Sequence, residues 1–280
     1  MKIDANRIVV PTDLAPVIDA FWYSTSEGEA HEISPVQCCL PNGNVEFIVH
    51  TTPQRLTANM PAGQVFLPEA YVIGIKKEPL YYTFPAGASM FGISIRPEVF
   101  TQLFNCSINP IARHYAEANS FIGPQVGAYI RKLKVAKNDA QRSAAAVGFL
   151  RNFLAGREQQ STNHQYLNKV MAQIRQASFT PRMRDLEEQV FLSKRQLQRV
   201  FQDKIGLSAK TYGRIIRFWQ AFEYVQRHPK ANWIDITYHF GYADQSHFIR
   251  DFREFTGSKP STFMSEFTSQ TFYSVFLSPQ

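Results

Sequence analysis

Cysteine is scarce in this sequence of 280 residues, which contains only Cys38, Cys39 and Cys106. No two of them are separated by two residues, so the paired thiolates that are typical of structural zinc sites are missing. Three cysteines, of which two are adjacent, do not suggest a disulfide framework either. The sequence therefore predicts a protein without metal or disulfide crosslinks, as expected in the reducing cytoplasm.

Long hydrophobic runs are also missing. No stretch of about 18 apolar residues occurs, so we expect no transmembrane helix and no membrane partner. Residues 1–11 lack the apolar core of a signal peptide. Both observations favour a cytoplasmic location.

The sequence lacks the common catalytic motifs. There is no HExxH, GxSxG, phosphate-binding loop or dinucleotide fingerprint. His31-Glu32 and His50 could still meet across strands as metal ligands, but ordinary core or surface histidines are the simpler interpretation. We therefore predict that the protein is not an enzyme and has no cofactor and no metal site.

Positive charge is concentrated in the C-terminal part. The formal net charge is +7. Residues 1–160 hold 14 basic and 13 acidic residues, a net of +1, and residues 161–280 hold 16 and 10, a net of +6. A basic surface suits nucleic acid, although a solvated helical surface has the same composition.

The N-terminal part has the pattern of a β-domain. Up to about residue 105, short β-rich runs alternate with turn clusters such as Pro41-Asn42-Gly43-Asn44. This spacing predicts a small barrel or sandwich. After Arg96-Pro97 the pattern becomes helical, and a polar stretch near 156–163 suggests a linker.

An internal repeat organises the C-terminal part. Residues 193–206 align with residues 244–257 at an offset of 51, which matches Arg199 with Arg250 and Gly206 with Gly257. Each copy has a short helix, a tight turn, an N-cap residue, a helix of about three turns and a glycine stop. This is the helix-turn-helix pattern.

The second helix of each copy has an outer face suited to DNA. Leu197, Val200 and Phe201 share one face of the first copy, so the opposite face points outward. An α-helix fits the major groove, where Arg reads guanine, Gln reads adenine and an apolar group meets the thymine methyl. The predicted base-facing residues are Arg195, Gln198, Arg199, Gln245, Ser246, Ile249 and Arg250. The predicted phosphate contacts are Lys194, Lys204, Arg217 and Arg253.

Residues 165–268 resemble the AraC/XylS family of bacterial transcription regulators. The resemblance is carried by Gly241-Tyr-Ala-Asp-Gln-Ser-His-Phe-Ile-Arg-Asp-Phe-Arg-Glu-Phe-Thr-Gly257 and by Leu192-Ser193-Lys-Arg-Gln-Leu-Gln-Arg-Val-Phe. It implies two helix-turn-helix units joined by one long helix, near 208–226, that reach subsites about 10 bp apart. The first unit departs from the family at Glu187 and Phe191, where Ala and Gly are usual.

The N-terminal part resembles, more weakly, the cupin-like sensor domain that precedes some AraC-type modules. Pro41-Asn-Gly-Asn-Val-Glu-Phe-Ile48 and Phe91-Gly-Ile-Ser-Ile-Arg-Pro97 carry this likeness. Such domains bind effectors or dimerise, here through helices near 119–136 and 139–156. The predicted ligand-binding residues are Trp22, Tyr23, Glu46 and Arg96, although core packing and ion pairing explain the same residue types.

The predicted fold is therefore α+β, with a cupin-like β-barrel and following helices at 1–157, a linker at 158–164, and a double helix-turn-helix domain at 165–280. The resemblance implies a sequence-specific DNA-binding transcription regulator, expected to be an activator, that is modulated by a small molecule in the barrel. Its implied partners are double-stranded DNA, RNA polymerase, an effector and a second copy in a homodimer, in the bacterial cytoplasm at the nucleoid. The alternative is a constitutive DNA-binding regulator whose N-terminal domain only dimerises or contacts a protein.

Overall fold

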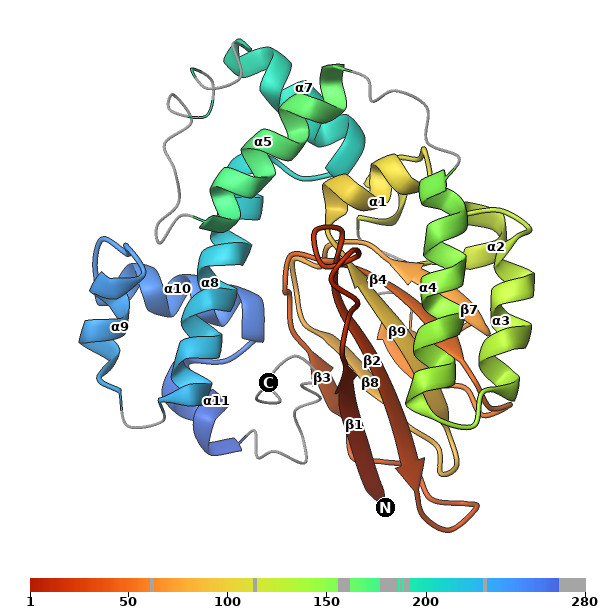
Figure 1. The fold of residues 1–280 in the computed structure, drawn as a ribbon. Helices are drawn as coiled ribbons and strands as arrows, with labels where there is room; N and C mark the ends of the chain where they lie inside the picture. The colour runs from red at the N-terminus through yellow and green to blue at the C-terminus, as the bar shows by residue number, and fades with distance from the viewer. Residues whose placement is uncertain are drawn as a thin grey trace.

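The protein has an α+β fold with β-sheets in its N-terminal part and helices alone in its C-terminal part (Figure 1). In Figure 1 the sheets and helices α1–α4 lie on the right, and the helices that follow α5 lie above and to the left. A computed structural model describes residues 1–60, 63–112, 115–155, 162–176, 186, 188, 192–228 and 231–266. Among the helices in these ranges, none is both long and apolar enough to cross a bilayer.

The larger sheet has six antiparallel strands in the order β1-β2-β9-β4-β7-β10. Its central strand β4 is buried along its whole length, because helices cover one face and the second sheet covers the other. The strands are β1 (Lys2–Ile8), β2 (Ile18–Glu27), β4 (Val45–His50), β7 (Ala70–Ile73), β9 (Ser89–Ile95) and β10 (Tyr115–Glu117).

The smaller sheet has four strands in the order β3-β8-β5-β6. Side chains from both sheets, including Trp22, Ile48 and Tyr82, form a separate hydrophobic cluster. The predicted β-domain, a small barrel or sandwich, is confirmed; its described strands form two sheets, and a closed barrel is not shown. The strands are β3 (Gln37–Cys39), β5 (Thr57–Met60), β6 (Gly63–Phe66) and β8 (Leu80–Thr83).

Helices follow the strands where the pattern changes at Arg96-Pro97. Pro97 occupies the first position of α1, where its missing N–H and fixed φ favour a helix start. Tyr129 of α3 and Phe149 of α4 stack with ring centroids 4.5 Å apart, which joins these two helices into a hairpin over the larger sheet. The helices are α1 (Pro97–Leu103), η1 (Asn109–Ile111), α2 (Ala118–Phe121), α3 (Val126–Val135) and α4 (Asp139–Ala155).

The C-terminal helices match the predicted spans closely. The long helix begins after the N-cap Ser208 and ends at Arg227. Residues 162–164, the end of the predicted linker, belong to α5, and residues 158–161 lie outside the described residues. The helices are α5 (Thr162–Gln176), α7 (Lys194–Ile205), α8 (Ala209–Arg227), α9 (Trp233–His239), α10 (Gln245–Thr256) and α11 (Pro260–Glu266).

Candidate nucleic-acid interface

Helix α7 has the shape and faces predicted for the first recognition helix. Ser193 accepts a hydrogen bond from the backbone N–H of Gln196, and the Gln196 side chain accepts one from the Ser193 backbone, which completes a capping box. Gly206 ends the helix at φ 75°, a conformation that costs glycine little. The inward positions Leu197, Val200 and Phe201 are buried as predicted. Lys194, Arg195, Gln198 and Arg199 are all exposed.

Helix α10 repeats this construction. Asp244 caps it by accepting a hydrogen bond from the His247 backbone N–H at 2.7 Å, and Gly257 ends it at φ 79°. Phe248, Phe252 and Phe255 are buried. The side chains of Gln245, Ser246, Arg250 and Arg253 are exposed, and that of Ile249 is half-buried against the core.

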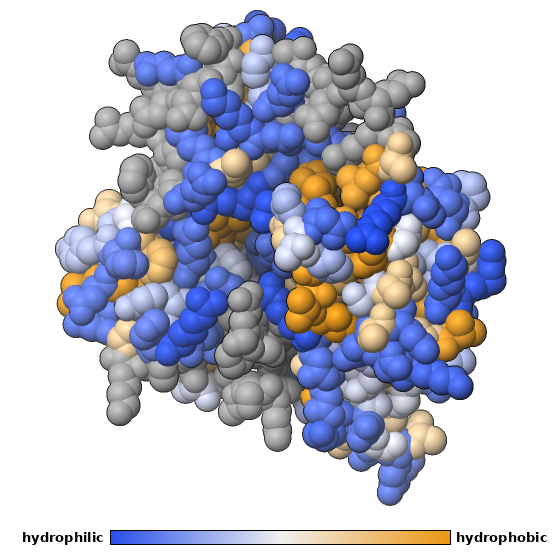
Figure 2. All heavy atoms as spheres, in the orientation of Figure 1, coloured by the Kyte–Doolittle hydropathy of each residue, from blue (hydrophilic) through white to orange (hydrophobic). Residues whose placement is uncertain are grey.

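The outward side of α10 is hollowed. A groove of about 550 Å³ runs along it, lined by the predicted contact residues Ser246, Ile249, Arg250 and Arg253 together with Glu254 and Lys259. Figure 2 shows that the surface over α7 is mainly hydrophilic, whereas hydrophobic side chains gather on the N-terminal domain around α1. Both recognition helices therefore offer their polar faces to the outside. Their base and phosphate contacts stay predictions.

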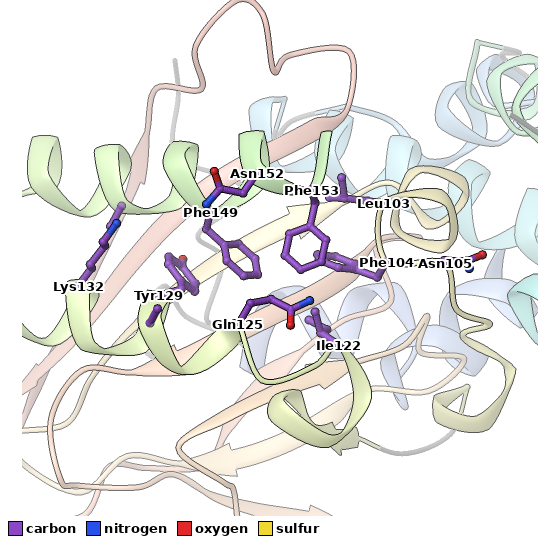
Figure 3. Close-up of a pocket in the computed structure, with 12 residues that line it drawn as sticks. Leu103, Phe104, Asn105, Ile122, Gln125, Tyr129, Lys132, Phe149, Asn152 and Phe153 are labelled. Atoms are coloured by element: carbon purple, nitrogen blue, oxygen red, sulfur yellow. The ribbon is translucent and has the colours of Figure 1, made fainter. Parts of the chain in front are cut away.

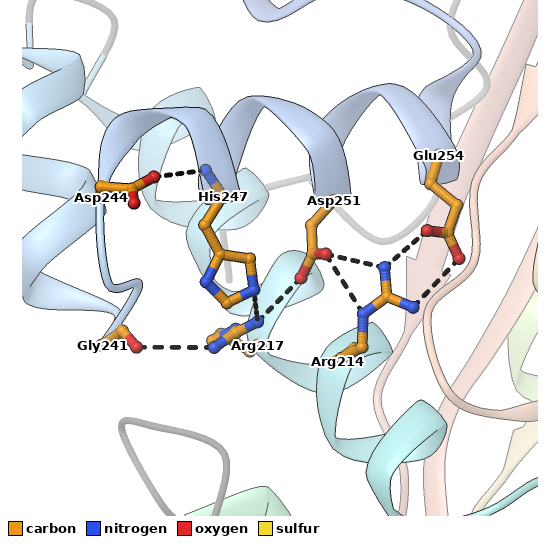
Figure 4. A network of polar contacts seen from close by, with 7 residues as sticks. All are labelled: Arg214, Arg217, Gly241, Asp244, His247, Asp251 and Glu254. Atoms are coloured by element: carbon orange, nitrogen blue, oxygen red, sulfur yellow. Dashed lines mark hydrogen bonds and ion pairs between the residues drawn. The ribbon is translucent and has the colours of Figure 1, made fainter.

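The structure contradicts the prediction made for Arg217. We predicted a phosphate contact, but this residue is only 6% exposed and its Nη2 donates to Asp251 Oδ2 at 2.8 Å (Figure 4). Its guanidinium also lies 3.9 Å from the ring centroid of Tyr242. Because its charge is already paired inside the protein, Arg217 fixes α10 to α8 instead of reaching DNA.

Arg214 completes this anchor, and the sequence reading missed it. Its Nη2 lies 2.7 Å from Asp251 Oδ1 and 2.5 Å from Glu254 Oε2, so two arginines of α8 hold one buried carboxylate of α10 (Figure 4). Asp251 follows Arg250 and lies on the inward face of the predicted helix. An acidic residue at an inward position was the sequence signal for this ion pair. A buried acid among aromatic residues requires a cation.

Helix α7 is anchored differently, through contacts with the N-terminal domain. The backbone N–H of Ile108 donates to the carbonyl of Lys204 at 2.9 Å, and the Ser107 hydroxyl donates to the carbonyl of Asp203. A Cβ built on Gly206 would lie 2.7 Å from Ala112 Cβ, so this glycine also permits close packing. Lys204 itself is half-buried there, and its predicted phosphate contact stays a prediction.

A buried ion pair joins the domains next to α7. Arg175 of α5 pairs with Glu98 of α1, which is 4% exposed, and its Nη1 also donates to Tyr212 Oη of α8 at 2.9 Å. Gln102 of α1 donates to Asn168 of α5 at 2.7 Å. The C-terminal domain is therefore docked on α1 by several polar contacts.

The predicted ligand residues do not meet at one place. Trp22 and Glu46 do meet: the indole Nε1 donates to Glu46 Oε2 at 3.1 Å, and Asn42 and Ser94 also donate to this carboxylate. Burial raises the pKa of Glu46, and the nearby Lys76 and these donors oppose that change. The cavity beside them, which Lys76 also lines, has a volume of about 30 Å³, room for about one water molecule.

The structure does not support the prediction that Tyr23 and Arg96 bind a ligand between the sheets. Tyr23 follows Trp22 on β2 and therefore faces the opposite side of the sheet, where the Arg142 guanidinium lies 3.7 Å from its ring centroid. Arg96 donates to the Pro16 carbonyl at 2.8 Å, away from the cavity. Neither side chain lines the space between the sheets.

Comparisons with known proteins divide the chain in the same way. A family described as a helix-turn-helix domain matches residues 186–266, and one described as a domain of unknown function (DUF6597) matches residues 6–117. The "Msm operon regulatory protein" of Streptococcus mutans is 28% identical over 110 residues, and the match spans 39% of this chain and only 39% of that relative's length.

Two solved structures are similar over most of the chain. ToxT from Vibrio cholerae is 10% identical with a TM-score of 0.47, over 96% of this chain and 99% of ToxT. The AraC-like transcriptional activator CuxR is 8% identical with a TM-score of 0.29, over 79% of this chain and 86% of CuxR.

Together, the capped and repeated helices and the family match define the C-terminal part as a DNA-binding helix-turn-helix domain. The domain is of the AraC type, so the resemblance seen in the sequence is confirmed. The first helix and the turn of its first unit, where Glu187 and Phe191 stand, lie largely outside the described residues.

Proposed function

We propose that the protein is a sequence-specific transcription regulator whose helices α7 and α10 enter successive major-groove segments of double-stranded DNA. The observation that carries this proposal is the matched pair of capped helices, each with a buried apolar face and an exposed face that contains Arg and Gln. Arg195, Gln198, Arg199, Gln245, Ser246, Ile249 and Arg250 read bases. Lys194, Lys204 and Arg253 hold phosphates.

The proposed division of labour assigns residues 1–157 to sensing or dimerisation, 158–164 to a linker and 165–280 to DNA. A small molecule, bound between the sheets beside Trp22 and Glu46, modulates the regulator. The cavity there holds about one water, so such a ligand requires Lys76 and its neighbours to move. The protein works in the bacterial cytoplasm at the nucleoid, as a homodimer and an activator that contacts RNA polymerase, and without catalysis.

A second candidate is a constitutive regulator whose N-terminal domain only dimerises or contacts a protein. The small size of the cavity between the sheets favours it. Under this alternative, no small molecule alters DNA binding by the full-length protein.

Selection of bound duplexes from a random DNA library tests the proposal. Full-length protein should enrich two short boxes about 10 bp apart. Arg195→Ala should erase information in one box and Arg250→Ala in the other, which assigns each box to its helix. Enrichment of no sequence, or of a motif that both variants retain, would contradict the proposal.

A further inference from the structure

A larger cavity lies outside the space between the sheets, in the hairpin of α3 and α4 (Figure 3). Its volume is about 460 Å³, within the range of about 300–1,000 Å³ that is typical of ligand pockets. Its floor reaches the end of α1 at Leu103 and Phe104. Neither the predicted ligand residues nor the proposed DNA contacts lie in it.

Aromatic rings form the apolar wall of this cavity. Tyr129 and Phe149 stack at an interplanar angle of 18°, and Phe153 meets Phe104 edge to face with centroids 4.8 Å apart (Figure 3). Such rings gain energy from a further planar ring placed against them.

The polar groups of the cavity select the rest of the ligand. Tyr129 is 2% exposed, and its hydroxyl has no hydrogen-bond partner among the described residues. The hydroxyl oxygen is itself buried, so a ligand in the cavity meets the ring of Tyr129 and not this oxygen. Gln125 and Asn152 add amide donors, and Lys132 at the rim is the lining residue that carries a charge. No carboxylate is among the described lining residues.

We propose that the α3–α4 cavity is a binding site for a planar aromatic carboxylate, whose ring packs against Tyr129, Phe149 and Phe153 and whose charge faces Lys132. This goes beyond the proposed function, which places a ligand between the sheets. It rests on that function only for the readout on DNA.

The cavity is also connected to the first recognition helix. Asn105 lines it and has a left-handed backbone, at φ 47°, a conformation uncommon outside glycine. Two residues further, Ser107 and Ile108 donate the hydrogen bonds that hold the end of α7. A ligand that moves Phe104 or Asn105 therefore acts on the segment that fixes α7.

Equilibrium dialysis of full-length protein with 1-naphthoate tests the site without DNA. We expect a Kd below about 1 mM and at least roughly tenfold weaker binding of the uncharged 1-naphthamide. Lys132→Ala should remove the preference for the charged probe.

A matched pair of variants separates this cavity from other sites. Ala128 lines the cavity and is exposed, and Ala144 is an exposed position of α4 that does not line it. Ala128→Phe should weaken naphthoate binding by at least about tenfold, and Ala144→Phe should leave it within about twofold. Equal binding by the two variants, or no binding of either probe to the wild type, overturns the proposal.

Two further readouts complete the test. Naphthoate should change the hydrogen-exchange rates of amides at the end of α7 at lower naphthoate concentrations than those of amides in α10. Naphthoate binding that weakens as protein concentration rises would show that a second copy covers the cavity, and would overturn the ligand assignment. If the wild-type protein binds no specific DNA sequence, the proposed function is contradicted, but the dialysis result for the cavity still stands.

Discussion

The two helix-turn-helix units repeat one sequence pattern but are anchored in different ways. Helix α10 is held inside its own domain, by the carboxylate of Asp251 between Arg214 and Arg217 of α8. Helix α7 is held by another domain, through Ser107 and Ile108. Gly257 after α10 also approaches the N-terminal domain, where a Cβ built on it would lie 3.0 Å from Tyr81 Oη, so this contact is one of close packing.

This difference in anchoring suggests that the two units differ in how strongly the N-terminal domain can affect them. The charges that fix α10 come from α8 of its own domain, so a shift of the N-terminal domain reaches α10 less directly. A helix whose last turn is bonded to the segment after α1 shifts when that segment shifts. This difference predicts that the N-terminal domain changes DNA binding mainly through the first unit.

Removal of the α10 anchor should have the largest effect. Asp251→Ala leaves the buried Arg217 without a counter-charge, which costs about 3–5 kcal/mol. The control is Glu254→Ala on the same helix, whose carboxylate is 45% exposed and whose ion pair is worth about 0–1 kcal/mol. Urea unfolding followed by circular dichroism measures both. Equal losses for the two variants would show that Asp251 is no special anchor.

Arg250→Ala tests base reading by the second unit. We expect a loss of about 1–3 kcal/mol at one base pair and relaxed specificity there, because Arg pairs with guanine through two hydrogen bonds. Binding to duplexes with single base changes gives the measurement. A uniform loss on every sequence would assign Arg250 to phosphate instead.

Ser107→Ala tests the anchor of the first unit. One hydrogen bond contributes about 0.5–1.5 kcal/mol, so amides in the last turn of α7 should exchange about two- to tenfold faster. Amides of α10 should be unchanged and serve as the internal control. Faster exchange in both helices would mean that the two units are anchored as one.

Lys194→Ala should have the smallest effect. An exposed lysine that neutralises one phosphate weakens binding to all sequences alike and reduces the slope of log K against log salt by about 0.9. Titrations at several salt concentrations measure it. An unchanged slope would remove Lys194 from the phosphate contacts.

The sequence predicted the helical domain well because its signals are local. Ser193, Asp244, Gly206 and Gly257 set helix ends within a few residues of themselves, and the repeat placed the buried faces. Arg217 was misread because its partner Asp251 lies 34 residues away. No local pattern distinguishes a buried arginine from a surface one.

The N-terminal domain was predicted less well, since its sites depend on pairing between distant strands. Trp22 and Tyr23 were grouped as ligand residues, although neighbours on a strand face opposite sides. The alternation of side chains along β2 was the sequence signal that Trp22 and Tyr23 lie on opposite faces. The α3–α4 cavity depends on how α1 meets that hairpin, which periodicity does not predict.

The most direct test measures how removal of the α7 anchor changes sequence-specific DNA binding. Full-length wild type and Ser107→Ala are titrated with the selected two-box duplex and with duplexes in which one box is scrambled. The account predicts that the substitution changes the affinity lost on scrambling the α7 box and leaves the loss for the α10 box unchanged. Equal changes for both boxes, or no change for either, would contradict the claim that the N-terminal domain acts on DNA reading mainly through the first reading helix.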